Sequence, residues 1–354
     1  MLIDKLMTVF SDDIGIDLGT MNTLVHVAGR GIVMEEPSVV ALNKDTNKVI
    51  AVGKRAKDML GRNPGNILTI RPMKDGVIAD AEVADEMLRY FINKSRGHYK
   101  VMQPRVVIAV PYGINEVEVR AVQDSAKKAG AREVRLVPEP LASAIGVKLP
   151  VSDPTGSMIV DIGGGTSEVA IISLSSIVNA ESVKCGGDAM DDAIREYMMK
   201  THSLLIGERM AEDIKKTIGS AAPVENLQDS MEVKGRELGQ HGNSLPREVT
   251  ITAEEIRKAL DPPINQIIAA IRRTLDKCKP ELAGDLLNNG IRLAGGGSLL
   301  KGLAERIQTE TNLFTLVAED SLHAVINGLG ELLKDPHVLF GQPQSTSVGN
   351  AYKQ

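Results

Sequence analysis

Two segments of this chain share one pattern: an apolar strand ends in an aspartate and is followed by a glycine-containing turn and a second strand. The first segment is Ile14–Thr23 with Asp17 at the strand tip, and the second is Met158–Ile172 with Asp161 in the same place. Successive glycines let backbone N–H groups converge on an anion without side chains in the way. Together with the Thr166 hydroxyl, this pattern suits a phosphate chain carrying Mg²⁺, which we expect to be held through water.

The repetition carries more weight than either turn, because a lone Gly-Gly-Gly is more often an ordinary tight hairpin. Asp17 and Asp161 are 144 positions apart, which is about one domain length. We therefore predict two related lobes that face each other with a nucleotide between them.

Length and composition exclude several classes of protein. With 354 residues, 43% of them hydrophobic, the chain can bury a large core and is too long for one compact domain. A net charge of −5 without a basic stripe argues against a nucleic-acid binder. Cys185 and Cys278 are isolated and lack metal-ligand spacing, which favours a reduced, cytoplasmic setting. No apolar run approaches the roughly 18 residues that span a bilayer.

Glu139 lies between two prolines, in Pro138-Glu139-Pro140, directly before an apolar helical segment. One interpretation is an acid at a helix N-terminus, where the helix dipole favours negative charge. The other is a carboxylate that positions or deprotonates an attacking water. The local sequence leaves both open.

Several other segments have a plain structural interpretation. Residues 54–66 are basic and are expected to form a solvated face, and Pro262-Pro263 predicts a break in the helix that opens after Thr252. Acidic and basic side chains recur at one-turn spacing within 206–216, as in a surface charge pattern. The glycine turn at 295–298 follows a strand and precedes a helix, so backbone can approach a ligand there.

Two segments are candidate membrane contacts. Residues 1–12 place five apolar side chains on one helical face, which suits either an interfacial anchor or a helix packed on the body. The loop 97–104 carries Val101 and Met102, which either form a contact surface or fold back on the core. The five side chains in the first segment are Leu2, Ile3, Leu6, Met7 and Phe10.

Together these segments resemble the actin, Hsp70 and sugar-kinase ATPase superfamily and, within it, the MreB family of bacterial actin-like cytoskeletal proteins. The resemblance extends over about residues 1–340, and the order of six motifs makes it specific. It implies an α/β, actin-like duplicated fold, with four subdomains around a nucleotide cleft. The motifs are Gly15–Thr23, Asn66–Asp80, Pro138–Gly146, Asp161–Ala170, Gly207–Lys216 and Leu293–Leu300.

The resemblance also implies subdomain boundaries. An N-terminal amphipathic segment, 1–12, and a polar tail, 341–354, flank the body. The subdomains are IA (13–32, 67–147 and 315–340), IB (33–66), IIA (148–181 and 246–314) and IIB (182–245).

Site residues follow from the resemblance in the same way. Glu139 would orient the hydrolytic water with help from Thr166, while Asp17 and Asp161 would hold the water shell of the Mg²⁺ that accompanies ATP. The phosphate loops would be Gly19, Thr20, Met21 and Asn22, and Gly163, Gly164, Gly165 and Thr166. The adenosine pocket would comprise Glu208, Glu212, Asp213, Ile214 and Lys215, with Gly295, Gly296, Gly297 and Ser298 against the adenosine and α-phosphate.

Members of this family form antiparallel double protofilaments on the inner face of the cytoplasmic membrane and direct cell-wall synthesis for rod shape. The resemblance thus implies a slow ATPase coupled to polymerisation and located peripherally on that membrane. Its partners would be further copies of itself, the membrane and cell-wall elongation proteins, with no nucleic acid. It also favours the membrane interpretation of 1–12 and of Val101 and Met102.

Two alternatives belong to the same superfamily. A chaperone-type ATPase needs a substrate-binding domain after the nucleotide domain, and we expect no room for one before residue 354. A small-molecule kinase needs an acceptor pocket, and no insertion suggests one. Two departures from the family pattern bear on mechanism: Pro138 replaces an acid before Glu139, which bears on hydrolysis, and Leu329 replaces a small residue, which bears on lobe closure.

Overall fold

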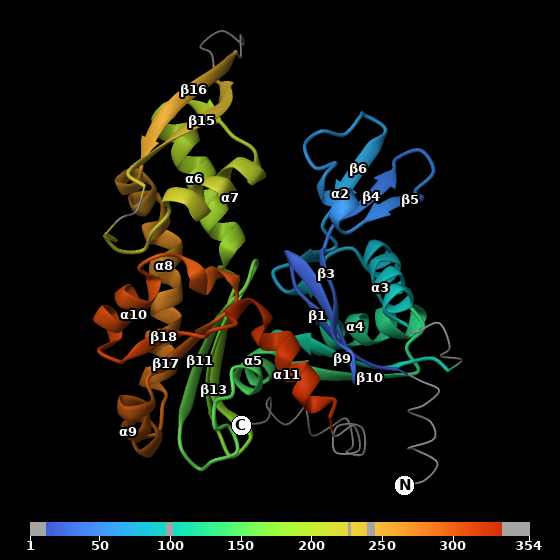
Figure 1. The fold of residues 1–354 in the computed structure, drawn as a ribbon, viewed down its shortest axis with the longest axis vertical. Helices are drawn as coiled ribbons and strands as arrows, with labels where there is room; N and C mark the ends of the chain where they lie inside the picture. Colours follow the sequence, from blue (N-terminus) through green and yellow to red (C-terminus); the bar gives the residue numbers. More distant parts are fainter. Residues whose placement is uncertain (1–11, 97–101, 226–227, 239–244, 335–354) are drawn as a thin grey trace.

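The computed structural model of the chain describes residues 12–96, 102–225, 228–238 and 245–334. They form two lobes side by side, called here the first and the second lobe (Figure 1). Each lobe has a five-stranded sheet in its lower part and a three-stranded sheet in its upper part. The subdomain boundaries given above remain a prediction.

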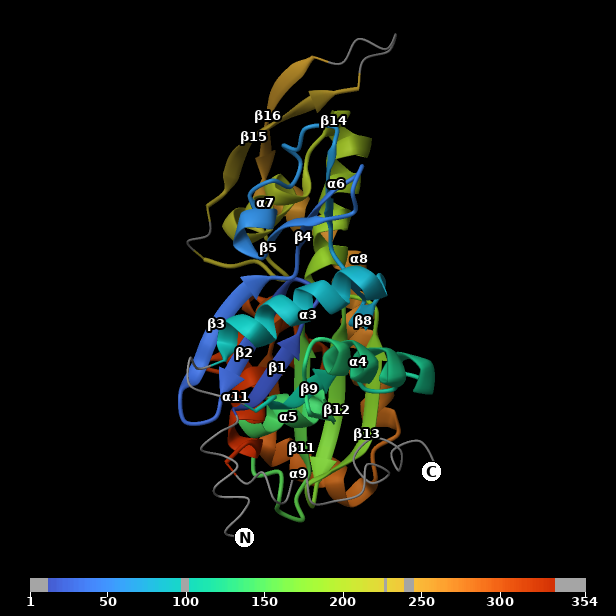
Figure 2. The same ribbon diagram turned by 90° about the vertical axis from the view of Figure 1, so that its right-hand side faces the viewer.

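The large sheet of the first lobe has the strand order β10-β9-β1-β2-β3. The antiparallel strands β1 to β3 come first along the chain, and β9 and β10 then add in parallel. Helices α3 and α4 cover the face turned away from the second lobe (Figure 2). The bounds are β1 Asp13–Leu18, β2 Asn22–Val27, β3 Gly31–Pro37, β9 Arg105–Val110, β10 Glu133–Pro138, α3 Ala81–Ser95 and α4 Glu116–Lys128.

The upper part of the first lobe is a small sheet with a short helix, and a two-stranded hairpin belongs to the same lobe. The small sheet has the order β5-β4-β6, and β7 pairs with β8. The bounds are β4 Val40–Asn43, β5 Val49–Val52, β6 Ile67–Ile70, α2 Lys54–Lys57, β7 Met73–Lys74 and β8 Val77–Ile78.

The second lobe repeats this plan. Its large sheet has the order β13-β12-β11-β17-β18, again with three antiparallel strands followed by two that add in parallel. The lower part contains β11 Ser157–Ile162, β12 Ser167–Ser173, β13 Ser176–Val183, β17 Ile291–Ala294, β18 Thr315–Val317, α8 Ala253–Asp276, α9 Pro280–Asn289, α10 Leu303–Thr311 and the 3₁₀ turns η1 Gly296–Leu299 and η2 Ser321–His323. The upper part contains α6 Gly187–His202, β14 Leu204–Leu205, α7 Glu208–Ile218, β15 Ser230–Glu237 and β16 Pro246–Thr252.

Two crossing helices, α5 (Glu139–Gly146) and α11 (Ala324–Leu332), join the large sheets (Figure 1). They can approach closely because Gly146 and Gly328 have no side chain. A Cβ at either position would lie only 1.8 Å from a backbone oxygen of the other helix. One side of the pair packs on apolar residues of the first sheet and the other side on those of the second. Leu329 is fully buried in this joint.

Helix α8 runs unbroken through Pro262 and Pro263, so the predicted break is wrong. Each interior proline costs about 3 kcal/mol through its missing N–H and ring clash. The helix keeps a continuous apolar face, and the neighbouring Leu260 and Ile264 are fully buried in the core of the second lobe. Burial of that face offsets the local penalty.

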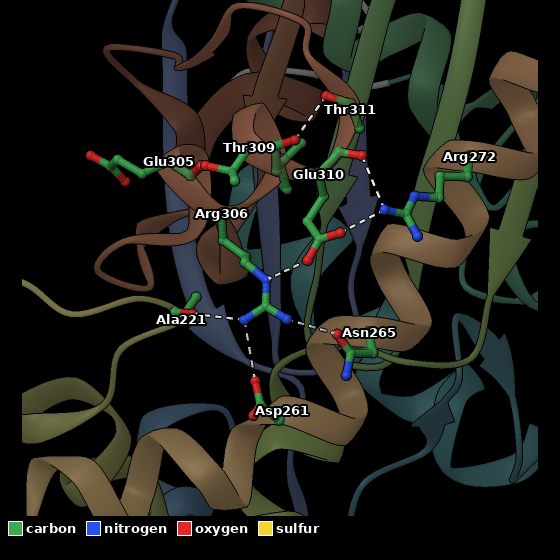
Figure 3. Close-up of polar contacts among 10 residues, drawn as sticks. Ala221, Asp261, Asn265, Arg272, Glu305, Arg306, Thr309, Glu310 and Thr311 are labelled. Atoms are coloured by element: carbon green, nitrogen blue, oxygen red, sulfur yellow. Dashed lines mark hydrogen bonds and ion pairs between the residues drawn. The ribbon is translucent and has the colours of Figure 1, made fainter.

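An arginine–carboxylate network fixes α10 against α8 (Figure 3). Arg306 donates to Asp261 (3.3 Å), Asn265 (3.1 Å) and Glu310 (3.0 Å). Arg272 of α8 reaches Glu310 from the other side at 2.5 Å. The network holds α10 against α8 just after η1, so the glycine turn that precedes α10 has a fixed support.

Candidate functional site

A cleft of about 590 Å³ lies between the lobes, and residues of both sheets line it. The two repeated turns, β1–β2 and β11–β12, stand opposite each other in its wall. Most of the expected site residues lie on this wall. They are Asp17, Gly19, Thr20, Met21, Asn22, Glu139, Asp161, Gly163, Gly164, Gly165, Thr166, Glu212, Lys215, Gly295, Gly296 and Gly297.

The two hairpins have identical register. Asp17 pairs across its hairpin with Leu24, and Asp161 pairs across the other with Glu168, so each aspartate faces the residue seven positions later. Four residues lie between the last paired positions of each hairpin: Gly19–Asn22 between Leu18 and Thr23, and Gly163–Thr166 between Ile162 and Ser167. The sequence repeat is thus a structural repeat that brings both carboxyl groups to one cleft.

The two turns also touch each other. A Cβ at Gly164 would lie 2.3 Å from Cγ of Met21, and one at Gly165 would lie 2.7 Å from Oγ1 of Thr20. The same Thr20 hydroxyl accepts a hydrogen bond from the Gly76 amide (3.2 Å). Gly164 and Gly165 are therefore required because side chains of the first turn occupy the space beside them.

Helix α6 holds the second turn from behind. The Gly187 amide donates to the Gly163 oxygen (2.9 Å) and the Asp188 amide to the Gly164 oxygen (2.8 Å). Lys215 braces this helix start, since its ammonium donates to the Gly187 oxygen (2.8 Å) and pairs with Asp191 (2.9 Å). Lys215 therefore lies on the cleft wall with its charge already engaged.

Four acidic side chains gather at the base of the cleft. Burial, and next the charge of Asp161, raise the pKa of Asp17 to about 7. Burial raises the pKa of Asp161 to about 6 and that of Glu168 to about 7. The pKa of Glu139 is raised well above its usual value by burial and then by the charge of Glu168. The arrangement disfavours the ionised acids until positive charge arrives.

The acidic base fits a hydrated cation. Oδ2 of Asp161 is buried and meets no hydrogen-bond donor of the described residues. No group of three or more histidine, cysteine or acidic side chains in the described ranges is arranged to hold a metal directly. A Mg²⁺ ion that keeps several waters would suit such a site better than a bare ion.

The predicted adenosine side is only partly on the wall. Helix α7 turns Glu212 and Lys215 toward the cleft, but Ile214 points into the core and is fully buried, and Asp213 is exposed. Glu208 lies off the wall and pairs across the cleft with Arg71 at 3.3 Å. Consecutive helical residues point in different directions, so a continuous stretch cannot line one wall.

Ser298 also departs from the expectation. Its hydroxyl donates to the Gly295 oxygen (2.6 Å), and the side chain is buried. It therefore closes its own turn instead of facing the cleft.

Several residues on the wall were not expected there. Lys57 belongs to the segment interpreted as a solvated face, yet it lines the cleft and reaches Glu212 at 3.9 Å. Leu299 and Leu322 also line it and are 54% and 53% exposed. Gly187 and Asp188 line the cleft as well. Among these unexpected residues, only they have a local sequence signal, which is the glycine pair Gly186-Gly187 directly before a helix.

Most of the predicted membrane residues lie outside the described residues. These are Leu2, Ile3, Leu6, Met7, Phe10 and Val101. Met102 is half-buried, and its carbonyl oxygen accepts a hydrogen bond from Arg96 (3.2 Å). Among the helices of the described ranges, none has the length and apolar character to cross a bilayer.

Comparison with known proteins places this cleft in context. A family model described as MreB/Mbl protein matches residues 11–339. The chain is 48% identical over 338 residues to the cell shape-determining protein MreB of Escherichia coli (strain K12), covering 94% of this chain and 96% of that protein.

Solved structures agree with this match. The crystal structure of MreB5 of Spiroplasma citri bound to ADP superposes with a TM-score of 0.88 at 38% identity, covering 94% of this chain and 99% of that chain. The AMPPNP-bound structure of the same protein gives a TM-score of 0.87 at the same identity and coverage. The predicted two-lobed, actin-like α/β fold is confirmed.

Proposed function

This chain belongs to the MreB/Mbl family, and from that premise we propose that it is an ATP-binding, slowly ATP-hydrolysing cytoskeletal protein. It assembles with copies of itself into filaments that determine cell shape. One observation carries the proposal: two hairpins of identical register present Asp17 and Asp161 to the same cleft. The relatives described above include a protein crystallised with ADP and with AMPPNP.

The proposed phosphate site uses both turns. The Gly163 amide already donates to the Thr166 oxygen (2.9 Å) and closes the turn. The backbone amides of Gly164 and Gly165 and of the first turn bind the β- and γ-phosphates, and the hydroxyls of Thr20 and Thr166 complete the shell. Asp17 and Asp161 hold the waters of Mg²⁺, which when bound neutralises charge on the phosphate oxygens. Asp161 brings a buried oxygen that has no donor among the described residues, and this supports the assignment.

Glu139 is the proposed water-orienting residue. It is the first residue of α5, directly after β10, and lines the cleft with both aspartates. Its pKa, raised by burial and by the charge of Glu168, makes Glu139 a stronger base than an ordinary carboxylate, which suits a group that accepts a proton from water. The alternative of a mere helix-dipole partner does not account for its place among three other acids.

The proposed adenosine site lies at the far end of the same wall. Leu299 and Leu322 offer apolar surface for the base, and Glu212 offers an acceptor for polar groups of the nucleoside. Lys215 acts through Asp191 and the start of α6, so we assign it to support of the second turn.

Sedimentation and phosphate release together test this function. The full chain is incubated with Mg²⁺ and either ATP or AMPPNP, and polymer and free phosphate are measured over a range of protein concentrations. We expect polymer with both nucleotides and phosphate release with ATP alone. Absence of polymer at every concentration, with and without liposomes, would overturn the cytoskeletal assignment, and transfer of phosphate to a metabolite would favour a kinase.

Membrane association and cell-wall partners are further parts of the proposal. Residues 1–12 place apolar side chains on one helical face, with Val101 and Met102 as a second contact. The location is peripheral, on the inner face of the cytoplasmic membrane, where filaments would organise cell-wall elongation proteins. Removal of residues 1–11 should weaken co-sedimentation with liposomes. Equal binding by the truncated chain would assign the contact to Val101 and Met102.

A further inference from the structure

Glu168 occupies a place that packing alone does not require. It pairs with Asp161 on one side and Ser182 on the other, in the middle of the large sheet of the second lobe. The same position in the first lobe is Leu24, and both side chains are buried, with 1% and 5% exposure. A buried carboxyl group costs free energy unless it makes specific contacts, so the polar residue calls for a role.

The Glu168 carboxyl group joins the two lobes. The hydroxyl of Ser182, in the same lobe, donates to Oε1 at 2.6 Å. The backbone amide of Tyr112, which follows β9 of the first lobe, donates to Oε2 at 3.2 Å. Each oxygen of this buried group thus has a partner, one in each lobe, and the side chain of Thr166 also interacts with the same carboxyl group and lowers its pKa.

On the first-lobe side, the bridge ends beside the water-orienting residue. β9 and β10 are parallel neighbours in which Val110 pairs with Pro138. Tyr112 lies two residues past Val110, and Glu139 lies one residue past Pro138. The Tyr112 amide and Glu139 therefore follow the neighbouring ends of two paired strands.

On the second-lobe side, the bridge ends beside the phosphate turn. Thr166 ends the turn two residues before Glu168, and its side chain hydrogen-bonds the Glu168 carboxyl group, which lowers the pKa of Glu168. Thr166 lines the cleft. The Glu168 bridge therefore joins the turn that carries Thr166 to the strand ends that carry Glu139.

We propose that Glu168 is a positioning residue for hydrolysis, which sets Glu139 of the first lobe against Thr166 of the second by bridging Tyr112 and Ser182. This inference rests on the proposed ATPase function and adds to it a residue that need not touch the nucleotide. Its contribution is geometric: a side chain that hydrogen-bonds both the Tyr112 amide and the Ser182 hydroxyl matters, whereas the negative charge does not.

Three substitutions at this position separate bridging from charge. Glu168→Gln removes the charge, but its amide oxygen can accept from Tyr112 while its NH₂ donates to Ser182. Glu168→Ala removes the bridge. Glu168→Leu copies Leu24 of the first lobe and fills the space without bridging, so it remains informative if the alanine variant does not fold. The matched control is Glu181→Ala on β13, whose carboxylate pairs with Arg273 within the second lobe.

Steady-state phosphate release by the full chain with Mg²⁺ and ATP gives the first readout. The alanine and leucine variants should lose about tenfold or more in kcat, with little change in KM, because misplacement of reacting groups costs rate more than binding. Glu168→Gln should recover most of the wild-type kcat, and Glu181→Ala should match wild type. A glutamine variant as slow as the alanine variant, or an alanine variant as fast as wild type, would overturn the proposal.

Hydrogen exchange gives a second readout that does not depend on hydrolysis. Loss of the bridge should speed exchange of the Tyr112 amide in Glu168→Ala and not in Glu181→Ala. If wild type releases no phosphate while Tyr112 responds as expected, the ATPase assignment fails and the bridge stands. If Tyr112 exchange is unchanged in Glu168→Ala, the bridge itself is wrong, whatever the rate of hydrolysis.

Discussion

The two central hairpins have the same register and complementary contents. The turn of the first lobe carries side chains, Thr20 and Met21, whereas the turn of the second lobe carries three glycines, two of which, Gly164 and Gly165, leave room for them. One half of the duplicated fold supplies bulk and a hydroxyl, and the other supplies space and backbone donors. The comparison teaches that the proposed phosphate site needs both hairpins, because the side chains of one turn fill the space that the glycines of the other leave.

The two lobes also differ in the row of three paired residues that begins at each aspartate and crosses three neighbouring strands. Asp17, Leu24 and Glu35 lie side by side in the first lobe, as Asp161, Glu168 and Ser182 do in the second. In the first lobe the central residue packs on α11 and the acid at the edge faces His323 at 3.5 Å. In the second lobe the acid is central and buried. One topological position thus serves packing in one half and coupling between lobes in the other.

The largest expected effect is at Glu139, which belongs to neither hairpin and faces both. Glu139→Ala should lower the rate of phosphate release by about 100-fold or more, because a positioned proton acceptor is lost. ATP affinity should change little. Binding and single-turnover hydrolysis measure the two effects separately, with Glu254→Ala, exposed on α8, as control. Unchanged hydrolysis would remove Glu139 from the mechanism.

The next effect tests whether the hairpins share one cation. Asp17→Asn and Asp161→Asn should each raise the Mg²⁺ concentration needed for half-maximal ATP binding by about tenfold, as loss of an outer-shell carboxylate does at other metal sites. Titration with Mg²⁺ at fixed ATP measures the shift, and Asp153→Asn in an exposed loop is the matched control. A response from one aspartate alone would mean that only one lobe holds the ion.

A third comparison uses equivalent glycines, Gly19 and Gly163, each two residues after its aspartate. A Cβ at Gly19 would lie 2.6 Å from the Asn22 oxygen, whereas one at Gly163 would lie 3.3 Å from the Thr166 oxygen. Gly19→Ala should therefore lower the free energy of unfolding by about 1–3 kcal/mol more than Gly163→Ala, a typical cost of overpacking. Urea denaturation measures both, and equal losses would contradict the asymmetry.

The smallest expected effect depends on pH. The pKa of Asp17 is about 7 in the folded chain against 3.8 ordinarily, so the folded state binds this proton more tightly than the unfolded state. The stability contributed by Asp17 is present at acid pH and is lost as the pH rises from about 4 to about 7. Without Mg²⁺, wild type should lose about 1.4 kcal/mol relative to Asp17→Asn between pH 6 and pH 8.

The same measurement on Asp161→Asn sharpens the comparison between hairpins. The pKa of Asp161 is about 6, below that of Asp17. The loss of protein stability caused by ionisation of Asp161 should therefore be complete at a lower pH than the loss caused by Asp17. Denaturation series at several pH values, with and without Mg²⁺ and AMPPNP, follow both. If wild type instead became more stable relative to either asparagine variant as the pH rises, the result would contradict the burial of these carboxyl groups.

The sequence predicts the fold through features that are local. A strand, an aspartate and a glycine turn are readable from neighbouring residues, and their repetition at Asp17 and Asp161 indicates a duplicated fold. The local sequence around Glu139 leaves two interpretations open, and its place in the nucleotide site is predicted by the resemblance to the MreB family.

Other features depend on contacts that the local pattern does not contain. Glu168 follows a glycine turn, and the local sequence predicts only an ordinary strand residue. Its contact with the Tyr112 amide, which follows β9, is formed only in the folded chain. Lys57 belongs to a basic run whose other members face solvent, and only lobe closure brings it near Glu212. Pro262 and Pro263 favour a helix break locally, and burial of the α8 apolar face outweighs that preference.

The most direct test is a structure of the full chain with Mg²⁺ and AMPPNP. We expect the β- and γ-phosphates within hydrogen-bonding distance of backbone amides from both turns, Gly19–Asn22 and Gly163–Thr166, with the waters of Mg²⁺ contacting both Asp17 and Asp161. Phosphates held by one turn alone, or a nucleotide bound outside the cleft between the lobes, would contradict the shared site.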